Sequence, residues 1–256
     1  MKRLAGVAVV AALISGFAAS TASANHSWNG YHWARTSNPF TLKVGNNLTT
    51  ADWVAHYRQT LSDWSKSDVL DLAEVAGGAR NKQCRPTAGR DEVCNGNYGF
   101  NGWLGLATIW LQSGTLHITQ GTEKMNDTYF ALAQYNNSAE REHVMCQEIG
   151  HTFGLTHQDE SGISLNTCMD YYQNTSDSDT KSTTPNQHDY DELATIYAHL
   201  DSSTTLGLAA DGPGNSAADL PAWANPRESV YVDHLANGQT QISFVLWANP
   251  IHGWAG

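Results

Sequence analysis

The stretch C-Q-E-I-G-H-T-F-G-L-T-H, residues 146–157, carries the pattern on which the fold and chemistry of this chain depend. A helix rises about 1.5 Å per residue, so Gln147 and His151 lie one turn apart on one face and can converge on one ion. Gly154 can adopt the left-handed conformation that ends a helix and turns the chain back. His157 can then reach the same ion from another direction. The spacing predicts a zinc site with three protein ligands and an open position.

Glu148 projects beside the predicted ion, where it can hold an attacking water. This pattern resembles that of the metzincin clan of zinc peptidases, whose motif is H-E-x-x-H-x-x-G-x-x-H followed by a Met-turn. The chain matches at Glu148, His151, Gly154 and His157, and C-M-D-Y at residues 168–171 is similar to the Met-turn. The resemblance extends over roughly residues 28–200 and implies a metzincin-like catalytic domain.

The resemblance also implies roles for single residues. Glu148 would act as the general base, and Met169 would lie beneath the metal. Tyr171 matches the position where some metzincin families place a tyrosine near the metal, where it would bind zinc or stabilise an oxyanion. Tyr172 is its rival for that role, and burial in the core is the alternative for Tyr171.

The first ligand position holds Gln147, where the family has histidine. An amide oxygen can coordinate zinc, but it is a poorer donor than imidazole. Three interpretations follow. Gln147 is a weak ligand, or two histidines and waters hold the metal, or the site is degenerate and the scaffold inactive. Retention of Glu148, both histidines, Gly154 and the Met-turn favours an active site.

The chain has 11 histidines. His143 lies eight residues before His151, about 12 Å along a helix, which is too far for both to bind one ion. His117, His188 and His199 have no metal-ligand spacing along the sequence. The acidic residues 177–179 are a weak candidate for structural calcium, and a solvated loop is the simpler interpretation.

Four cysteines in an exported chain are expected to form disulfides. Three pairings are possible. Cys84 and Cys94 bracket a short loop and favour one bridge, which leaves Cys146 and Cys168. That second bridge would tie the active-site helix to the Met-turn.

Apolar periodicity and the order of the elements predict an α/β sandwich. The metzincin resemblance implies an α/β (α+β) domain with a twisted mixed sheet, an active-site helix and a C-terminal helix. Residues 77–99 read as a polar loop that holds two cysteines. The expected strands are 40–44, 69–75, 105–111 and 115–122, and the expected helices are 51–66, 137–153 and 185–200. An Asn-Gly dipeptide at 237–238 predicts a hairpin of strands 229–235 and 240–247 as a small C-terminal appendage. Residues 201–219 look like a linker before a tail of residues 220–256.

The N-terminus reads as a secretory signal over residues 1–24: Lys2 and Arg3, an apolar run, then Ala-Ser-Ala. The apolar run is too short to span a bilayer, and no other stretch approaches that length. The formal net charge is −11, with no basic cluster to offset it, which makes nucleic-acid binding unlikely. Nine Trp and ten Tyr argue against disorder. We expect a secreted protein, monomeric in solution.

The pattern as a whole indicates a secreted zinc endopeptidase that takes an extended peptide along an edge strand, for which residues 114–122 are the candidate. The alternative is a non-catalytic or weakly active metzincin-like binding protein, motivated by Gln147. A carbohydrate-directed hydrolase would need paired catalytic carboxylates, and no such pair stands out.

Overall fold

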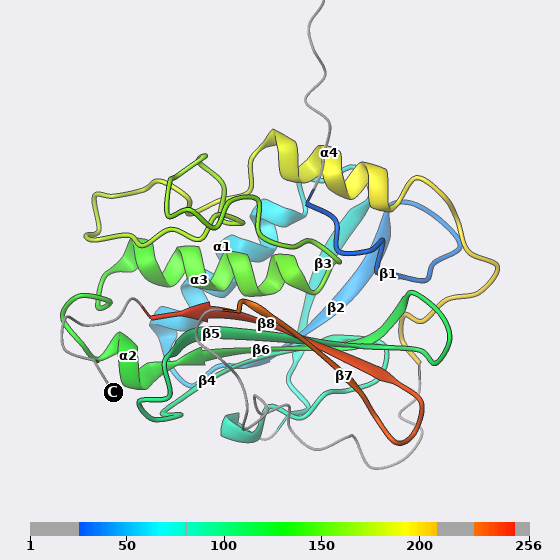
Figure 1. Cartoon of the computed structure of the whole chain (residues 1–256), viewed down its shortest axis with the longest axis horizontal. Coiled ribbons are helices and arrows are strands. Elements are labelled where there is room, and N and C mark those ends of the chain that lie inside the picture. Colours follow the sequence, from blue (N-terminus) through cyan, green and yellow to red (C-terminus); the bar gives the residue numbers. More distant parts are fainter. Residues whose placement is uncertain (1–25, 80, 209–227, 249–256) are drawn as a thin grey trace, which may run out of the picture.

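The computed structural model describes residues 26–79, 81–208 and 228–248 (Figure 1). It has a mixed α/β fold, with helices packed on one eight-stranded sheet. The strands are β1 (His32–Trp33), β2 (Phe40–Asn47), β3 (Leu70–Ala76), β4 (Asp91–Gly96), β5 (Trp103–Leu111), β6 (His117–Asn126), β7 (Val230–His234) and β8 (Thr240–Trp247). The helices are α1 (Ala51–Trp64), α2 (Asp127–Phe130), α3 (Ser138–His151) and α4 (Gln187–Ile196), with a 3-10 turn η1 (Asn81–Gln83).

The sheet has a parallel half and an antiparallel half. Its strand order is β3-β2-β4-β6-β5-β8-β7, with β1 added parallel to β6. Strands β3, β2, β4 and β6 run parallel, and β5, β8 and β7 pair antiparallel. Helices α1 and α3 lie on one face of this sheet, with α4 beyond them (Figure 1). The mixed sheet predicted from the sequence is therefore present.

Helix α1 shows how the expected pattern folds. Thr50 caps it by accepting a hydrogen bond from the Trp53 amide. Trp53, Tyr57 and Trp64 then recur on its buried face and pack into the core. The Trp64 indole donates to the Cys146 carbonyl at 3.1 Å, which joins α1 to α3. The aromatic face thus positions the helix that carries the motif.

The expectation of a polar loop over residues 77–99 is wrong in part, because β4 lies within it. The strand reads as polar, yet Asp91, Glu92 and Asn95 are all buried. Each finds a partner far away in sequence or from the other side of a turn; the Thr152 hydroxyl, for example, donates to Asp91 Oδ2 at 2.8 Å. A buried polar strand of this kind has no local hydrophobic signal. The Cys84–Cys94 disulfide ties this strand to the preceding loop, as expected.

The C-terminal hairpin forms around Gly238, whose φ is +82°. It is not a separate appendage, because β8 pairs with β5 over most of its length and extends the main sheet. The expected linker also differs at its start: Thr205 donates its amide to the Ala34 carbonyl, and Gly207 donates to Gly89. Helix α4 also ends earlier than expected, at Ile196, with Tyr197 as its C-cap. Residues 209–227 of the linker and tail lie outside the described residues.

Residues 114–122, expected to form an edge strand, lie inside the sheet instead. This segment forms much of β6, which pairs with β4 on one side and β5 on the other. Its backbone groups are therefore engaged within the sheet. The strand next to the motif helix on the antiparallel side is β5, and β8 occupies the far side of β5.

The signal predicted at residues 1–24 lies outside the described residues. Among the described residues, no helix combines the length and the apolar character needed to cross a bilayer. The oligomeric state expected from the sequence stays a prediction.

Gly154 ends the motif helix region with φ +93°, and a Cβ added there would lie 1.9 Å from the Tyr31 carbonyl oxygen. We therefore expect Gly154→Ala to lower the free energy of unfolding by at least about 3 kcal/mol, because it adds a backbone clash to an unfavourable φ. Gly162→Ala is the matched control, since Gly162 has φ +84° and open space around it. It should cost only about 1 kcal/mol. Urea denaturation of both variants measures the difference, and equal losses would contradict the clash.

Candidate functional site

Helix α3 carries three of the predicted site residues. Asn137 caps it by accepting from the Glu140 amide at 2.8 Å. The reciprocal bond of a capping box is absent, because Glu140 Oε2 instead accepts from the Asn174 amide at 2.6 Å. Burial raises the pKa of Glu140 to about 8. The last turns of the helix are fully buried and present Gln147, Glu148 and His151.

The two motif histidines face each other. His151 Nε2 and His157 Nε2 are 3.1 Å apart. The other nitrogen of each ring is committed: His151 Nδ1 donates to the Leu155 carbonyl at 2.9 Å, and His157 Nδ1 donates to Glu160 Oε1 at 2.7 Å. Each facing Nε2 therefore carries a lone pair. Two lone pairs at this distance need a cation or a proton between them, and the separation is close to the roughly 3.3 Å between two ligands of tetrahedral zinc.

Gln147 contributes one uncommitted oxygen. Its Nε2 donates to the carbonyls of Cys168 and Asp170, at 3.0 and 2.7 Å. These two bonds fix which way the amide points. Its Oε1 is buried and has no hydrogen-bond partner among the described residues. An amide held in this way offers only its oxygen to a ligand, on the face of α3 that also carries His151.

Glu148 lies against the backbone of β5. A Cβ added at Gly105 would come within 2.2 Å of Glu148 Oε1, so only glycine leaves room for this carboxylate. Neither carboxylate oxygen has a partner of normal hydrogen-bond geometry among the described residues. Burial raises the pKa of Glu148 well above its ordinary value, and the nearby backbone of Ala107 offsets this in part. Glu148 thus presents a buried carboxyl from the same helix that carries His151.

The turn that holds Met169 packs against helix α3. Met169 is fully buried, and its sulfur would lie 2.5 Å from a Cβ added at Gly150. The Met169 sulfur therefore packs directly against the turn of α3 that precedes His151. The Cys146–Cys168 disulfide expected from the sequence joins the same helix to the same turn.

The structure separates the two tyrosines. The Tyr171 ring packs edge-on against His157, with ring centroids 5.1 Å apart. Its hydroxyl accepts from the Trp247 amide at 2.6 Å, and burial raises its pKa. Tyr172 instead donates to Asp179 at 3.0 Å. Tyr171 is therefore the tyrosine beside the histidine pair.

Strand β8 covers these residues. The Phe244 ring stacks on the His151 ring with centroids 4.4 Å apart and an interplanar angle of 7°. The hairpin holds Tyr171 through Trp247, and Ser229 Oγ donates to Glu160 Oε1 at 2.5 Å, the oxygen that also binds His157. His151 is fully buried and His157 is 7% exposed. The site is closed on the β8 side.

A cavity of about 460 Å³ lies next to the closed site. Its wall includes Tyr171, Glu160, Leu246 and Trp247, and it does not include Glu148, His151 or His157. The end of β8 therefore lines this cavity, whereas Glu148 and the two motif histidines do not.

Two further clusters of metal-binding residue types occur among the described residues. They are His26 with His188 and Asp189, and His32 with His117 and Asp201. The acidic residues at 177 and 179 belong to neither cluster. Sequence reasoning missed both groups because their members come from segments far apart in the chain.

Comparisons with known proteins give distant structural likenesses only. No family model and no curated protein matches the chain. The structure of myroilysin is similar with 12% identity, covering 68% of this chain and 99% of that one, at a TM-score of 0.39. High choriolytic enzyme 1, a hatching enzyme zinc-protease from Oryzias latipes (Medaka fish), is similar with 9% identity over 66% of this chain and 96% of its own, at a TM-score of 0.36. Values this low identify neither an activity nor a substrate for this chain.

The role of Gln147 is testable by zinc affinity. We expect Gln147→Ala to weaken zinc binding about tenfold or more, because it removes the only uncommitted oxygen of the first ligand position. Gln147→His should tighten binding, since one ring nitrogen can donate to a Met-turn carbonyl while the other faces the ion. Chelator-competition titration measures both, and His157→Ala identifies which zinc equivalent belongs to this site.

Gln59→Ala, at an exposed position of α1, is the matched control and should leave zinc affinity unchanged. Equal affinity in wild type, Gln147→Ala and Gln147→His would show that Gln147 does not touch the metal.

Proposed function

We propose that this chain is a secreted zinc-dependent endopeptidase that hydrolyses peptide bonds with Glu148 as general base. The observation that carries the proposal is the histidine pair: two buried imidazoles whose Nδ1 atoms are committed and whose Nε2 lone pairs meet at 3.1 Å. Gln147 Oε1, buried without a partner among the described residues, supports a third ligand.

The donor set fits zinc. Imidazole nitrogen suits this ion, and the carbonyl and carboxylate that hold the two Nδ1 atoms are partners of the kind that orient zinc ligands. When bound, zinc would polarise the peptide carbonyl and lower the pKa of an attacking water.

The residues of the chain supply the proton transfers. Glu148 would take a proton from the water as the water oxygen bonds to the carbonyl carbon. It would then pass that proton to the amide nitrogen as the C–N bond breaks. Tyr171, once its hydroxyl is free of Trp247, would donate to the developing oxyanion. An extended peptide would lie along β5, on the side that β8 occupies in this structure.

The predicted signal at residues 1–24 and the two disulfides support secretion, since such bridges persist in oxidising compartments. A peptide or protein is the expected substrate.

The second candidate is a metzincin-like protein that binds partners without catalysis. Two observations favour it: Gln147 replaces a stronger ligand, and β8 closes the site. Zinc content and peptide cleavage together separate the two functions.

We expect Glu148→Gln to keep its zinc and lose at least about a hundredfold in peptidase rate, because it removes the proton acceptor without removing a ligand. Glu142→Gln is the matched control on the same helix; this side chain binds His56 and should leave the rate within about twofold. Mass-spectrometric detection of cleaved peptide-library products measures both.

Equal rates in wild type and Glu148→Gln would reject Glu148 as the base. The binding protein would be favoured if the zinc-loaded wild type cleaves no peptide and a zinc-loaded variant that lacks the β8 contacts cleaves none either.

A further inference from the structure

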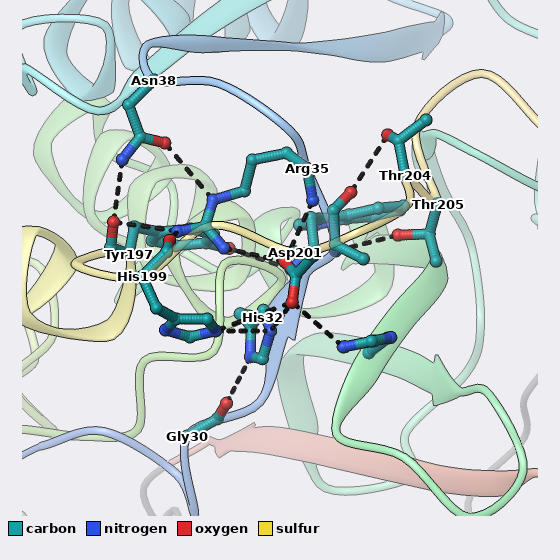
Figure 2. A network of polar contacts seen from close by, with 12 residues as sticks. Gly30, His32, Arg35, Asn38, Tyr197, His199, Asp201, Thr204 and Thr205 are labelled. Carbon is teal, nitrogen blue, oxygen red and sulfur yellow. Dashed lines mark hydrogen bonds and ion pairs between the residues drawn. The ribbon is translucent and has the colours of Figure 1, made fainter.

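The structure brings three histidines and one aspartate to one point outside the candidate active site. His32 belongs to β1, His117 begins β6, and His199 and Asp201 follow α4. Figure 2 shows His32 and His199 directed at the Asp201 carboxylate. The Nε2 atoms of His117, His32 and His199 lie 3.3, 3.5 and 3.7 Å from Asp201 Oδ1. The Nε2 atoms of His32 and His199 are 3.2 Å apart.

These spacings are those of a metal site. Zinc bonds of 2.0–2.1 Å in a tetrahedron place neighbouring ligand atoms about 3.3 Å apart. His32, His117 and Asp201 have their ligand atoms within 4.8 Å of one another. His199 lies outside this group of three, 3.2 Å from His32 Nε2 and 3.7 Å from Asp201 Oδ1, and its half-exposed side chain would have to move toward His117 to act as the fourth ligand.

A hydrogen bond to a backbone carbonyl fixes the tautomer of His32. Its Nδ1 donates to the Gly30 carbonyl at 2.7 Å, so its Nε2 carries a lone pair aimed at Asp201 and His199 (Figure 2). The side chain is only 6% exposed, and a histidine ligand oriented by a backbone carbonyl is usual at zinc sites.

The carboxylate is likewise oriented without help from the histidines. Asp201 Oδ2 accepts from the Arg35 amide at 3.1 Å and from Arg35 Nη1 at 3.0 Å. Arg35 is 1% exposed and is held by Asn38 and by the Tyr197 carbonyl. This leaves Asp201 Oδ1 directed at the imidazoles.

We propose that His32, His117, His199 and Asp201 form a second zinc site, structural and tetrahedral. Imidazole and carboxylate together suit zinc, and four protein ligands leave no open position. The ion would join three segments that are far apart in the sequence: β1, the start of β6 and the chain after α4. Its binding energy would contribute to folding stability.

The test uses the full chain. Zinc per chain is measured by elemental analysis after dialysis for His117→Ala/His199→Ala and for His234→Ala, a matched control at a histidine of the hairpin. The double variant should hold one zinc equivalent less than the control, whatever the candidate active site holds. Zinc added at a thousand times the dissociation constant of the second site should raise the Tm of the control by about 10 °C more than the Tm of the double variant.

Equal zinc content in the double variant and the control would overturn the site, and so would equal Tm shifts. If the double variant does not fold, His199→Ala alone gives the answer, because this half-exposed ligand is removed at little cost to packing. Its zinc should then dissociate at least about tenfold faster to a chelator than that of His234→Ala, and equal rates would reject the proposal.

A second inference rests on the proposed peptidase function and on different observations. Strand β8 runs antiparallel to β5 with Phe244 opposite Ala107, in the way an extended peptide adds to a sheet edge. Its Phe244 ring covers His151, and its backbone amide at Trp247 holds Tyr171.

We infer that β8 occupies the substrate position and keeps the enzyme latent until the hairpin leaves. The hairpin is suited to leave, because β8 pairs only with β5 and β7 and β7 is the last strand of the sheet. The part of the sheet from β3 to β5 keeps all its other strand pairings when the hairpin leaves.

Phe244→Ala in the full chain tests this inference, with Val232→Ala on the exposed side of β7 as matched control. Removal of the ring should raise the rate at which diethyl pyrocarbonate modifies His151 and His157 in metal-free protein about tenfold. Modification of His56, which lies on α1, should not change. Peptidase rate should rise by a similar factor, and Glu148→Gln should abolish the gain.

Unchanged labelling of His151 and His157 would overturn the latency inference even if the chain is a peptidase. Faster labelling without any peptidase activity would overturn latency together with the proposed function, and would leave β8 as a fixed part of a binding protein. Phe244→Leu, which removes the ring stacked on His151 but keeps an apolar side chain in the core, provides the same readouts if Phe244→Ala fails to fold.

Discussion

The arrangement of the site depends on the commitment of two imidazole nitrogens. The Leu155 carbonyl and the Glu160 carboxylate each accept a hydrogen bond from Nδ1 of a motif histidine, so the two Nε2 lone pairs face each other. That alignment needs the turn at Gly154, which brings His157 back over the helix and fits only because no side chain meets Tyr31. The disulfide and Met169 hold the helix from below. Backbone geometry, packing and electrostatics therefore together fix the positions of the two Nε2 atoms.

The helix and its motif could be predicted because their signals are local. Asn137 marks the start, Gly154 the end, and the spacing of Glu148, His151 and His157 identifies the chemistry. Strand β4 could not be found in this way, because Asp91 and its polar neighbours become strand residues only when distant partners such as Thr152 satisfy them. The hairpin was predictable from Asn-Gly, whereas its pairing with β5 depends on a contact between segments more than a hundred residues apart.

The same reasoning explains why His117 and His199 carried no metal signal in the sequence. A metal site made within one helix has a fixed spacing, and a site assembled from β1, β6 and the chain after α4 has none. The residue that could have hinted at it is Arg35, a fully buried guanidinium that requires a carboxylate partner and finds it in Asp201.

Because β8 is part of the chain that it covers, its competition with a substrate is intramolecular. A tethered strand acts at an effective concentration in the millimolar range, whatever the concentration of the protein. Free peptides at micromolar concentration would displace it rarely, and dilution of the protein would not weaken it. A cut between α4 and β7 would change the order of the reaction: the strand would then leave by dissociation, and the open fraction would depend on how much protein is present.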